Sequence, residues 1–131
     1  MKLHYADTSA WLKLVAEEAE TEAMLDHLAE VRGAGGSFIS SQLLMTEMHR
    51  AARRLDVTPV GVQDALGEIL LLLPSLETFR LAGRIPGENL RALDALHIAA
   101  AIESGADVFL TYDIRQAEAA NEAGIAVISP K

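Results

Sequence analysis

Four carboxylates occupy positions where a folding argument alone would not place them. Asp7 and Asp113 each follow a short apolar stretch, whereas Glu47 and Asp94 lie inside apolar helical patterns. A buried, unpaired carboxylate is costly, so it usually protonates, pairs with a positive group or binds a cation. Carboxylate oxygens are hard ligands that suit Mg²⁺ or Mn²⁺. Together, these acids predict a divalent-metal site.

Each acid also has an ordinary structural explanation. Asp is a favoured N-cap, so Asp7 and Asp113 could simply cap the helices that follow them, with Gln116 completing a capping box after Asp113. Asp94 is placed in mid-helix, where it has no cap to make. Arg91 at i−3 could neutralise Asp94, and Arg50 could pair with Glu47 in the same way. These alternatives stay open at the level of sequence.

Other residues of reactive type form no recognisable site. His97 follows Asp94 by one helical turn and could share its face, but a buried, hydrogen-bonded core histidine is the simpler interpretation. His4, His27 and His49 have no spacing typical of zinc ligands. The glycines at 33–36 lack the pattern of a phosphate loop. Trp11 and the few other aromatic residues are expected in the core.

Composition limits the class of protein. The 131 residues are 50% hydrophobic, which predicts one folded domain spanning 1–131. Cysteine is absent, which excludes disulfides, thiolate nucleophiles and cysteine-bound metals, and fits a reducing cytoplasm. No run of about 20 apolar residues predicts a membrane span, and the first residues do not have the build of a signal peptide. The net charge of −8 argues against a simple nucleic-acid binder.

Arginines nevertheless gather near the acids. Arg50, Arg53 and Arg54 follow Glu47, and Arg91 precedes Asp94. Arg50, Arg54, Arg91 and Arg115 are therefore candidates for phosphate contacts, which would position a nucleic acid without reading its sequence. Solvated helix surface or a protein interface is an equally good explanation for each arginine.

Short apolar runs alternate with helical patterns, which predicts a parallel sheet with helices on its faces. Strands are expected at 2–6, 37–40, 107–111 and 125–129, and helices at 8–18, 20–31, 42–54, after Pro59, 76–83, 90–104 and 113–123. The run at 70–74 could be a helix end or a buried strand. Asp7 and Asp113 then occupy equivalent places, each at the end of a strand and just before a helix. Ligands of open parallel sheets bind at that edge.

The chemistry that such a cluster supports is hydrolysis. Divalent ions lower the pKa of a bound water and stabilise charge on a phosphoryl group, so no protein nucleophile is required. No nucleophile-elbow pattern is present. Phosphodiester hydrolysis is the reaction class that these residues favour.

Four blocks of the sequence, taken in order, resemble the PIN-domain nucleases and, within them, the VapC toxins of type II toxin–antitoxin systems. The blocks are YADTSAWLKL, SSQLLMTEMHRA, LRALDALHIAAA and FLTYDIRQAEAANEAGIAVISP. The likeness runs from end to end of the chain, apart from a first strand made more polar by His4 and Tyr5.

This resemblance implies a three-layer α/β/α fold with a five-stranded parallel sheet and a Mg²⁺- or Mn²⁺-dependent endoribonuclease activity. It implies that Asp7, Glu47, Asp94 and Asp113 form the acidic cluster. It further implies supporting roles for Thr8, Ser9 and Thr111, which match positions that assist the acids or the water on the metal. As partners it implies an RNA substrate, a second copy of the chain, and a VapB-type antitoxin through which such complexes bind their operator DNA.

Two other functions compete with this one. A receiver-type phosphoacceptor domain shares the sheet and the acids, but it needs a lysine at the end of a late strand, and none of Lys2, Lys13 and Lys131 fits. A catalytically silent PIN fold that only binds RNA or a protein partner would keep the same blocks. Measured turnover would separate that module from an enzyme.

Overall fold

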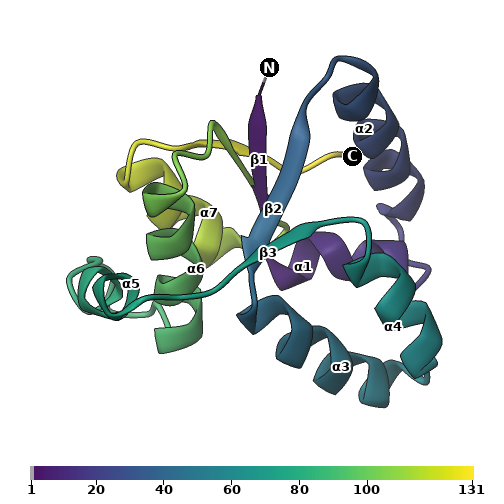
Figure 1. Ribbon diagram of the computed structural model, residues 1–131, viewed down its shortest axis with the longest axis horizontal. Helices are drawn as coiled ribbons and strands as arrows, with labels where there is room; N and C mark the ends of the chain where they lie inside the picture. Colours follow the sequence, from purple (N-terminus) through teal and green to yellow (C-terminus); the bar gives the residue numbers. More distant parts are fainter. Residues whose placement is uncertain (1) are drawn as a thin grey trace.

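The chain folds around a sheet of five parallel strands in the order β3-β2-β1-β4-β5 (Figure 1). The computed structural model describes residues 2–131. The strands are β1 (Leu3–Ala6), β2 (Ser37–Ser41), β3 (Leu70–Leu72), β4 (Val108–Leu110) and β5 (Ala126–Ile128). The helices are α1 (Thr8–Trp11), the 3₁₀ turn η1 (Leu12–Leu14), α2 (Thr21–Gly33), α3 (Leu43–Leu55), α4 (Pro59–Leu66), α5 (Leu76–Ala82), α6 (Ala92–Glu103) and α7 (Ile114–Glu122).

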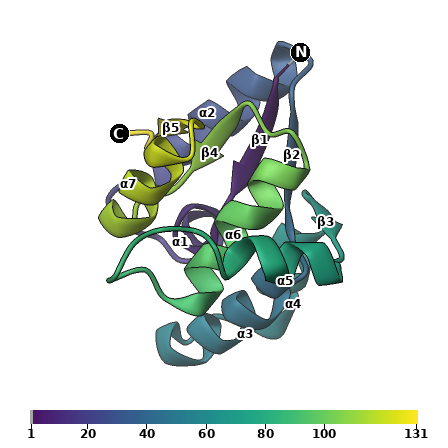
Figure 2. The ribbon, with the colours of Figure 1, turned by 90° about the vertical axis from the view of Figure 1, so that its left-hand side faces the viewer.

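Helices cover both faces of the sheet, as Figures 1 and 2 show. Alternate strand residues point to opposite faces, so each face builds its own core. On one face, Phe38 and Trp11 pack with residues of α1 to α4. On the other face, Tyr5, Ile39 and Phe109 pack with residues of α6 and α7. The predicted three-layer α/β/α fold is confirmed, and none of the helices in the described residues is long and apolar enough to cross a membrane.

The helix predicted over 8–18 is shorter than expected. It ends in the 3₁₀ turn at Leu14, because the following segment satisfies its backbone locally. The hydroxyl of Thr21 donates to the carbonyl of Ala16 and accepts from the amide of Glu18, at 3.2 and 2.9 Å. Such side-chain bonds compete with helical ones. Trp11 is fully buried, as predicted, and its ring nitrogen donates to the carbonyl of Ala65.

The other elements to compare with the prediction are α6, β3 and α4. The helix expected over 90–104 begins only at Ala92, because Arg91 has extended backbone angles. The ambiguous run at 70–74 contains the strand β3, which pairs with β2 at one edge of the sheet. The predicted start of α4 is confirmed, since the Thr58 hydroxyl caps it and Pro59 is its first residue.

Candidate active site

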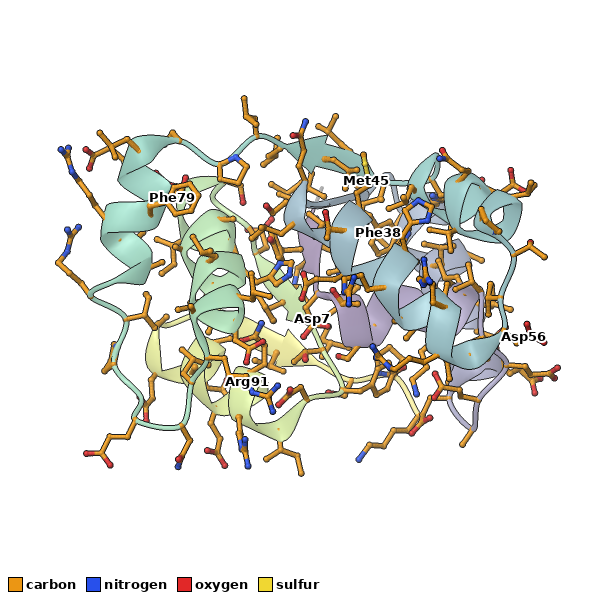
Figure 3. The ribbon with its side chains drawn as sticks, turned by 90° about the horizontal axis from the view of Figure 1, so that it is seen from below. Asp7, Phe38, Met45, Asp56, Phe79 and Arg91 are labelled. Atoms are coloured by element: carbon orange, nitrogen blue, oxygen red, sulfur yellow. The ribbon has the colours of Figure 1, made fainter. Side chains whose placement is uncertain are left out.

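The strand order reverses between β1 and β4, which both lie at the centre of the sheet. Open parallel sheets bind ligands outside the carboxyl ends of the strands at such a switch point. Asp7 directly follows β1 and Thr111 directly follows β4, so both lie at this edge. Figure 3 looks onto the molecule from below and shows Asp7 near its middle, between α3 and α6.

Asp7 is buried and fully hydrogen-bonded. Its Oδ1 accepts from the Ser9 hydroxyl at 2.7 Å and from the Ala10 amide at 3.1 Å. Its Oδ2 accepts from the Thr111 hydroxyl at 2.5 Å. The hydrogen bond from the Ala10 amide makes Asp7 the N-cap of α1, as predicted. Capping therefore uses one carboxylate oxygen, whereas the other accepts from Thr111, which follows the neighbouring strand β4.

The surroundings of Asp7 raise the pKa of its carboxyl. Burial raises the pKa of the Asp7 carboxyl, while hydrogen bonds from Thr111, Ser9 and Ala10 and the nearby His97 oppose this rise. Desolvation is the largest of these effects, since only 4% of the residue is exposed. A positive charge at this edge would stabilise the ionised form.

The two hydroxyls that hold Asp7 also fix the loop after β4. Ser9 Oγ accepts from the backbone amide of Tyr112 at 2.8 Å and lies 3.2 Å from Thr111 Oγ1. Thr111 Oγ1 in turn accepts from the amide of Asp113 at 3.0 Å. Ser9 and Thr111 therefore support the acid, whereas the Thr8 hydroxyl is buried without a hydrogen-bond partner in the described structure.

Glu47 reaches the site from α3 and is held by a histidine. Its Oε1 lies 2.5 Å from His97 Nε2, and the other ring nitrogen of His97 lies 2.8 Å from the Tyr5 hydroxyl. His97 is buried, as the core interpretation predicted, but it also joins α6 to an acid of the site. The alternative pairing of Glu47 with Arg50 is not formed in residues 2–131.

Asp94 projects from the first turn of α6 and not from its middle, which corrects the sequence prediction. An acid is favourable there because it faces the positive end of the helix dipole. Burial raises the pKa of Asp94, and the charges of Asp113 and Glu47 raise it further. The ion pair with Arg91 that was weighed as an alternative does not form in the described residues.

Asp113 is exposed and caps α7. Its Oδ1 accepts from the amides of Arg115 and Gln116, at 2.9 and 3.3 Å. The expected capping box is absent. The amide of Asp113 donates instead to Thr111, and the buried Oε1 of Gln116 has no partner in the described structure. The charge of Asp113 nevertheless acts on Asp94, so the two acids share one region of the edge.

The acids lie in one region of the sheet edge, but they do not form a preformed metal-binding site within the described residues. Within residues 2–131, no three aspartate, glutamate or histidine side chains converge closely enough to hold one metal ion as they stand. Both oxygens of Asp7 and one oxygen each of Glu47 and Asp113 accept or share hydrogen bonds within the protein.

The donor set still fits Mg²⁺ or Mn²⁺. Mg²⁺ keeps several waters and is usually held by only one or two protein carboxylates together with substrate phosphates. Asp94 carries a raised pKa that comes partly from two neighbouring acids, and a cation would relieve this repulsion.

The four candidate arginines are exposed and unpaired. Arg50 and Arg54 lie on α3, Arg91 at the start of α6, and Arg115 in the first turn of α7. None of them forms an ion pair within residues 2–131. In Figure 3, Arg91 lies beside the start of α6, on the side of the molecule where Asp7 is seen.

Sequence comparison reveals full-length relatives. A family model described as the PIN domain matches residues 5–122. Ribonuclease VapC35 of Mycobacterium tuberculosis is 35% identical over 137 residues, and ribonuclease VapC46 of the same species is 34% identical over 129 residues. Each alignment covers 96% of this chain and 96% of the relative.

Solved structures share the fold at low sequence identity. VapC20 of Mycobacterium tuberculosis, described as a toxin that cleaves the sarcin–ricin loop, superposes with a TM-score of 0.73 at 15% identity and covers 97% of this chain and 99% of its own. VapBC2 of Rickettsia felis, bound to a DNA fragment from its promoter, gives a TM-score of 0.70 at 12% identity, with 98% and 99% covered. The family model and the full-length relatives establish that this chain belongs to the PIN-domain family and, within it, to the VapC family.

Proposed function

We propose that this chain is the toxin of a VapBC-type pair, an endoribonuclease that uses Mg²⁺ or Mn²⁺ to hydrolyse RNA phosphodiester bonds. The observation that carries the proposal is the position of Asp7 at the switch point of the sheet, with Asp94 nearby under the influence of two further acids. Relatives named ribonuclease VapC, about a third identical over nearly their full length, support the substrate class.

Asp7 and Asp94 would provide the main metal contacts, with Glu47 and Asp113 completing the acidic edge. When bound, Mg²⁺ or Mn²⁺ supplies activation of water and neutralises charge that develops on the phosphate. Thr111 and Ser9 hold the Asp7 carboxylate in one orientation through their hydroxyls. His97 does the same for Glu47. Arg50, Arg54, Arg91 and Arg115 would bind phosphates of the RNA on either side of the edge.

A VapB-type antitoxin is the proposed protein partner, and this chain would act as a homodimer. The Rickettsia felis complex, whose fold the chain shares, contains both a VapB and a VapC component on promoter DNA. For this chain, contact with DNA would then be indirect, through the antitoxin. Light scattering of the chain alone should give twice the mass of the monomer.

The competing function is a PIN fold that binds RNA or a partner without cutting. Total RNA incubated with the purified chain separates the two. Discrete fragments that require Mg²⁺ or Mn²⁺ and disappear in EDTA support the enzyme. Intact RNA that is nevertheless retained by a folded, antitoxin-free protein supports the binding module. The variant Asp94→Asn serves as the control, because it removes one proposed ligand without changing the size of the side chain.

A further inference from the structure

A second group of reactive side chains lies at the opposite end of β1 from the acids. His4 on β1 and His27 on α2 line a pocket with a volume of about 310 Å³, together with Lys2 and Glu30. His4 is 4% exposed, and His27 is partly buried. The proposed nuclease site does not use this pocket, which lies three residues along the strand from Asp7.

Both histidines hold buried ring nitrogens that bind nothing in the described structure. Nδ1 of His4 and Nε2 of His27 are shielded from solvent and have no hydrogen-bond partner. Leaving a buried polar atom unpaired destabilises a fold, and native structures contain few such atoms. Two unsatisfied nitrogens on neighbouring rings therefore point to a shared ligand that would satisfy them.

The spacing of the rings suits a shared metal ion. The ring centres of His4 and His27 are 5.4 Å apart, and the ring planes meet at 64°. Two imidazoles on one tetrahedral ion, with metal–nitrogen bonds of about 2.1 Å, have centres roughly 5 Å apart. Neutral imidazole nitrogen suits Zn²⁺, Ni²⁺ or Cu²⁺ and is a poor ligand for Mg²⁺.

The surrounding charges permit a cation. Burial lowers the pKa of both histidines, and each therefore keeps a lone pair available at neutral pH. The groups that act on them are Lys2 and Asp107 beside His4 and Glu30 beside His27, which leaves one negative charge in excess.

We propose that His4 and His27 form a second metal site, which binds one borderline divalent transition metal, Zn²⁺ or its spectroscopic substitute Co²⁺, and ties α2 to β1. No third histidine or carboxylate within residues 2–131 joins the pair as it stands, so water completes the coordination. The two ends of β1 would then carry sites of different chemistry, oxygen ligands at Asp7 and nitrogen ligands at His4.

The test is a titration of tag-free protein with Zn²⁺ by calorimetry, repeated with Co²⁺ by visible absorption. With excess Mg²⁺ present to compete at the carboxylate edge, wild type should still bind one ion saturably, with Co²⁺ bands typical of tetrahedral coordination, and its melting temperature should rise. His4→Phe and His27→Gln should each weaken binding by at least about tenfold. His49→Gln and Asp94→Asn should leave the affinity unchanged.

Three results would overturn the proposal: no saturable binding by wild type, unchanged binding in both pocket variants, or a loss of binding in Asp94→Asn alone. If the His4→Phe protein fails to fold, His27→Gln decides, because His27 is only partly buried on α2. These measurements do not depend on nuclease activity. A negative result would therefore overturn the histidine site and leave the proposed function intact, and a failure of the proposed function would not affect the histidine site.

Discussion

His97 Nε2 lies 2.5 Å from Glu47 Oε1, and this contact joins α6 to α3 through two residues that are 50 positions apart in sequence. Burial raises the pKa of the Tyr5 hydroxyl far above its usual value, so that hydroxyl stays protonated. It can donate to Nδ1 of His97, which leaves Nε2–H to donate to the Glu47 carboxylate. Tyr5, His97 and Glu47 thus form a chain of two hydrogen bonds that uses both ring nitrogens of the histidine.

Breaking this chain should loosen Glu47 and destabilise the fold. His97→Leu removes both hydrogen bonds and takes the nitrogen acceptor away from the buried Tyr5 hydroxyl, so we expect a loss of about 1–3 kcal/mol in the free energy of unfolding. Tyr5→Phe removes only the outer bond and should cost less. Urea unfolding in EDTA measures both. Equal stability of His97→Leu and wild type would contradict the role of this chain.

Thr111→Val tests whether the hydrogen bond from Thr111 to Asp7 contributes to stability and activity. The substitution keeps the side-chain shape but removes the donor to Oδ2 of Asp7, which is buried. We expect about 1–3 kcal/mol of destabilisation and at least a roughly tenfold loss of RNA cleavage. Thr46→Val is a matched control, because Thr46 is exposed on α3 and its hydroxyl does not contact Asp7, whose side chain accepts from Ser9, Ala10 and Thr111. Equal effects of the two variants would contradict a specific role for Thr111.

Asp94→Asn should separate stability from activity. Burial and the charges of Asp113 and Glu47 raise the pKa of Asp94, so its negative charge is less favourable in the folded protein than in the unfolded chain. An uncharged Asn should therefore leave the metal-free protein at least as stable as wild type, while cleavage falls by at least about a hundredfold. Denaturant unfolding in EDTA tests the first part. A marked loss of stability would show that the charge of Asp94 is structural.

The sequence predicted the ends of the strands more reliably than the contacts between distant segments. Asp7 and Asp113 could be placed because a strand followed by a helix cap is a local pattern. The partner of Glu47 could not, because Arg50 lies one turn away in sequence whereas His97 approaches only when α6 packs beside α3. The spacing of Asp94 and His97 was visible, but nothing local indicated that the histidine turns towards an acid.

The start of α6 was misjudged for a similar reason. Leu90 continues the apolar periodicity of the helix, so the pattern extends before Ala92, although the backbone at Arg91 is extended. Leu90 belongs instead to the preceding turn, in which its amide donates to the carbonyl of Gly87. Asp94 therefore looked like a mid-helix acid when it lies in the first turn.

Stability should fall as the pH drops below neutrality, partly through His4. Burial and the nearby His27 lower the pKa of His4, so the unfolded chain binds a proton more readily than the folded one. This contribution to stability is complete above the unfolded pKa of about 6.5 and is lost as the pH falls below it. Urea unfolding between pH 7.5 and 5, in EDTA, should show a shallower dependence for His4→Phe than for His49→Gln. Parallel curves would rule out this role for His4.

The arginines of α3 should contribute to RNA binding through phosphate contacts. In the Asp94→Asn background, Arg50→Glu combined with Arg54→Glu should weaken RNA binding at low salt by at least about tenfold. Arg80→Glu with Arg84→Glu makes the same change in net charge on and just after α5, and should have a much smaller effect. Filter binding across salt concentrations compares the two. Equal losses would indicate a general charge effect and not a binding surface on α3.

Binding of Mn²⁺, followed by electron paramagnetic resonance as the free-ion signal decreases, tests the central claim most directly. Wild type should bind Mn²⁺ in competition with Mg²⁺, and RNA cleavage should follow the same titration. Asp94→Asn should weaken Mn²⁺ binding by at least about tenfold, whereas Asp64→Asn, an exposed acid on α4, should not. Mn²⁺ binding that is equal in wild type and Asp94→Asn, or cleavage that persists in EDTA, would contradict a metal-dependent nuclease at this edge.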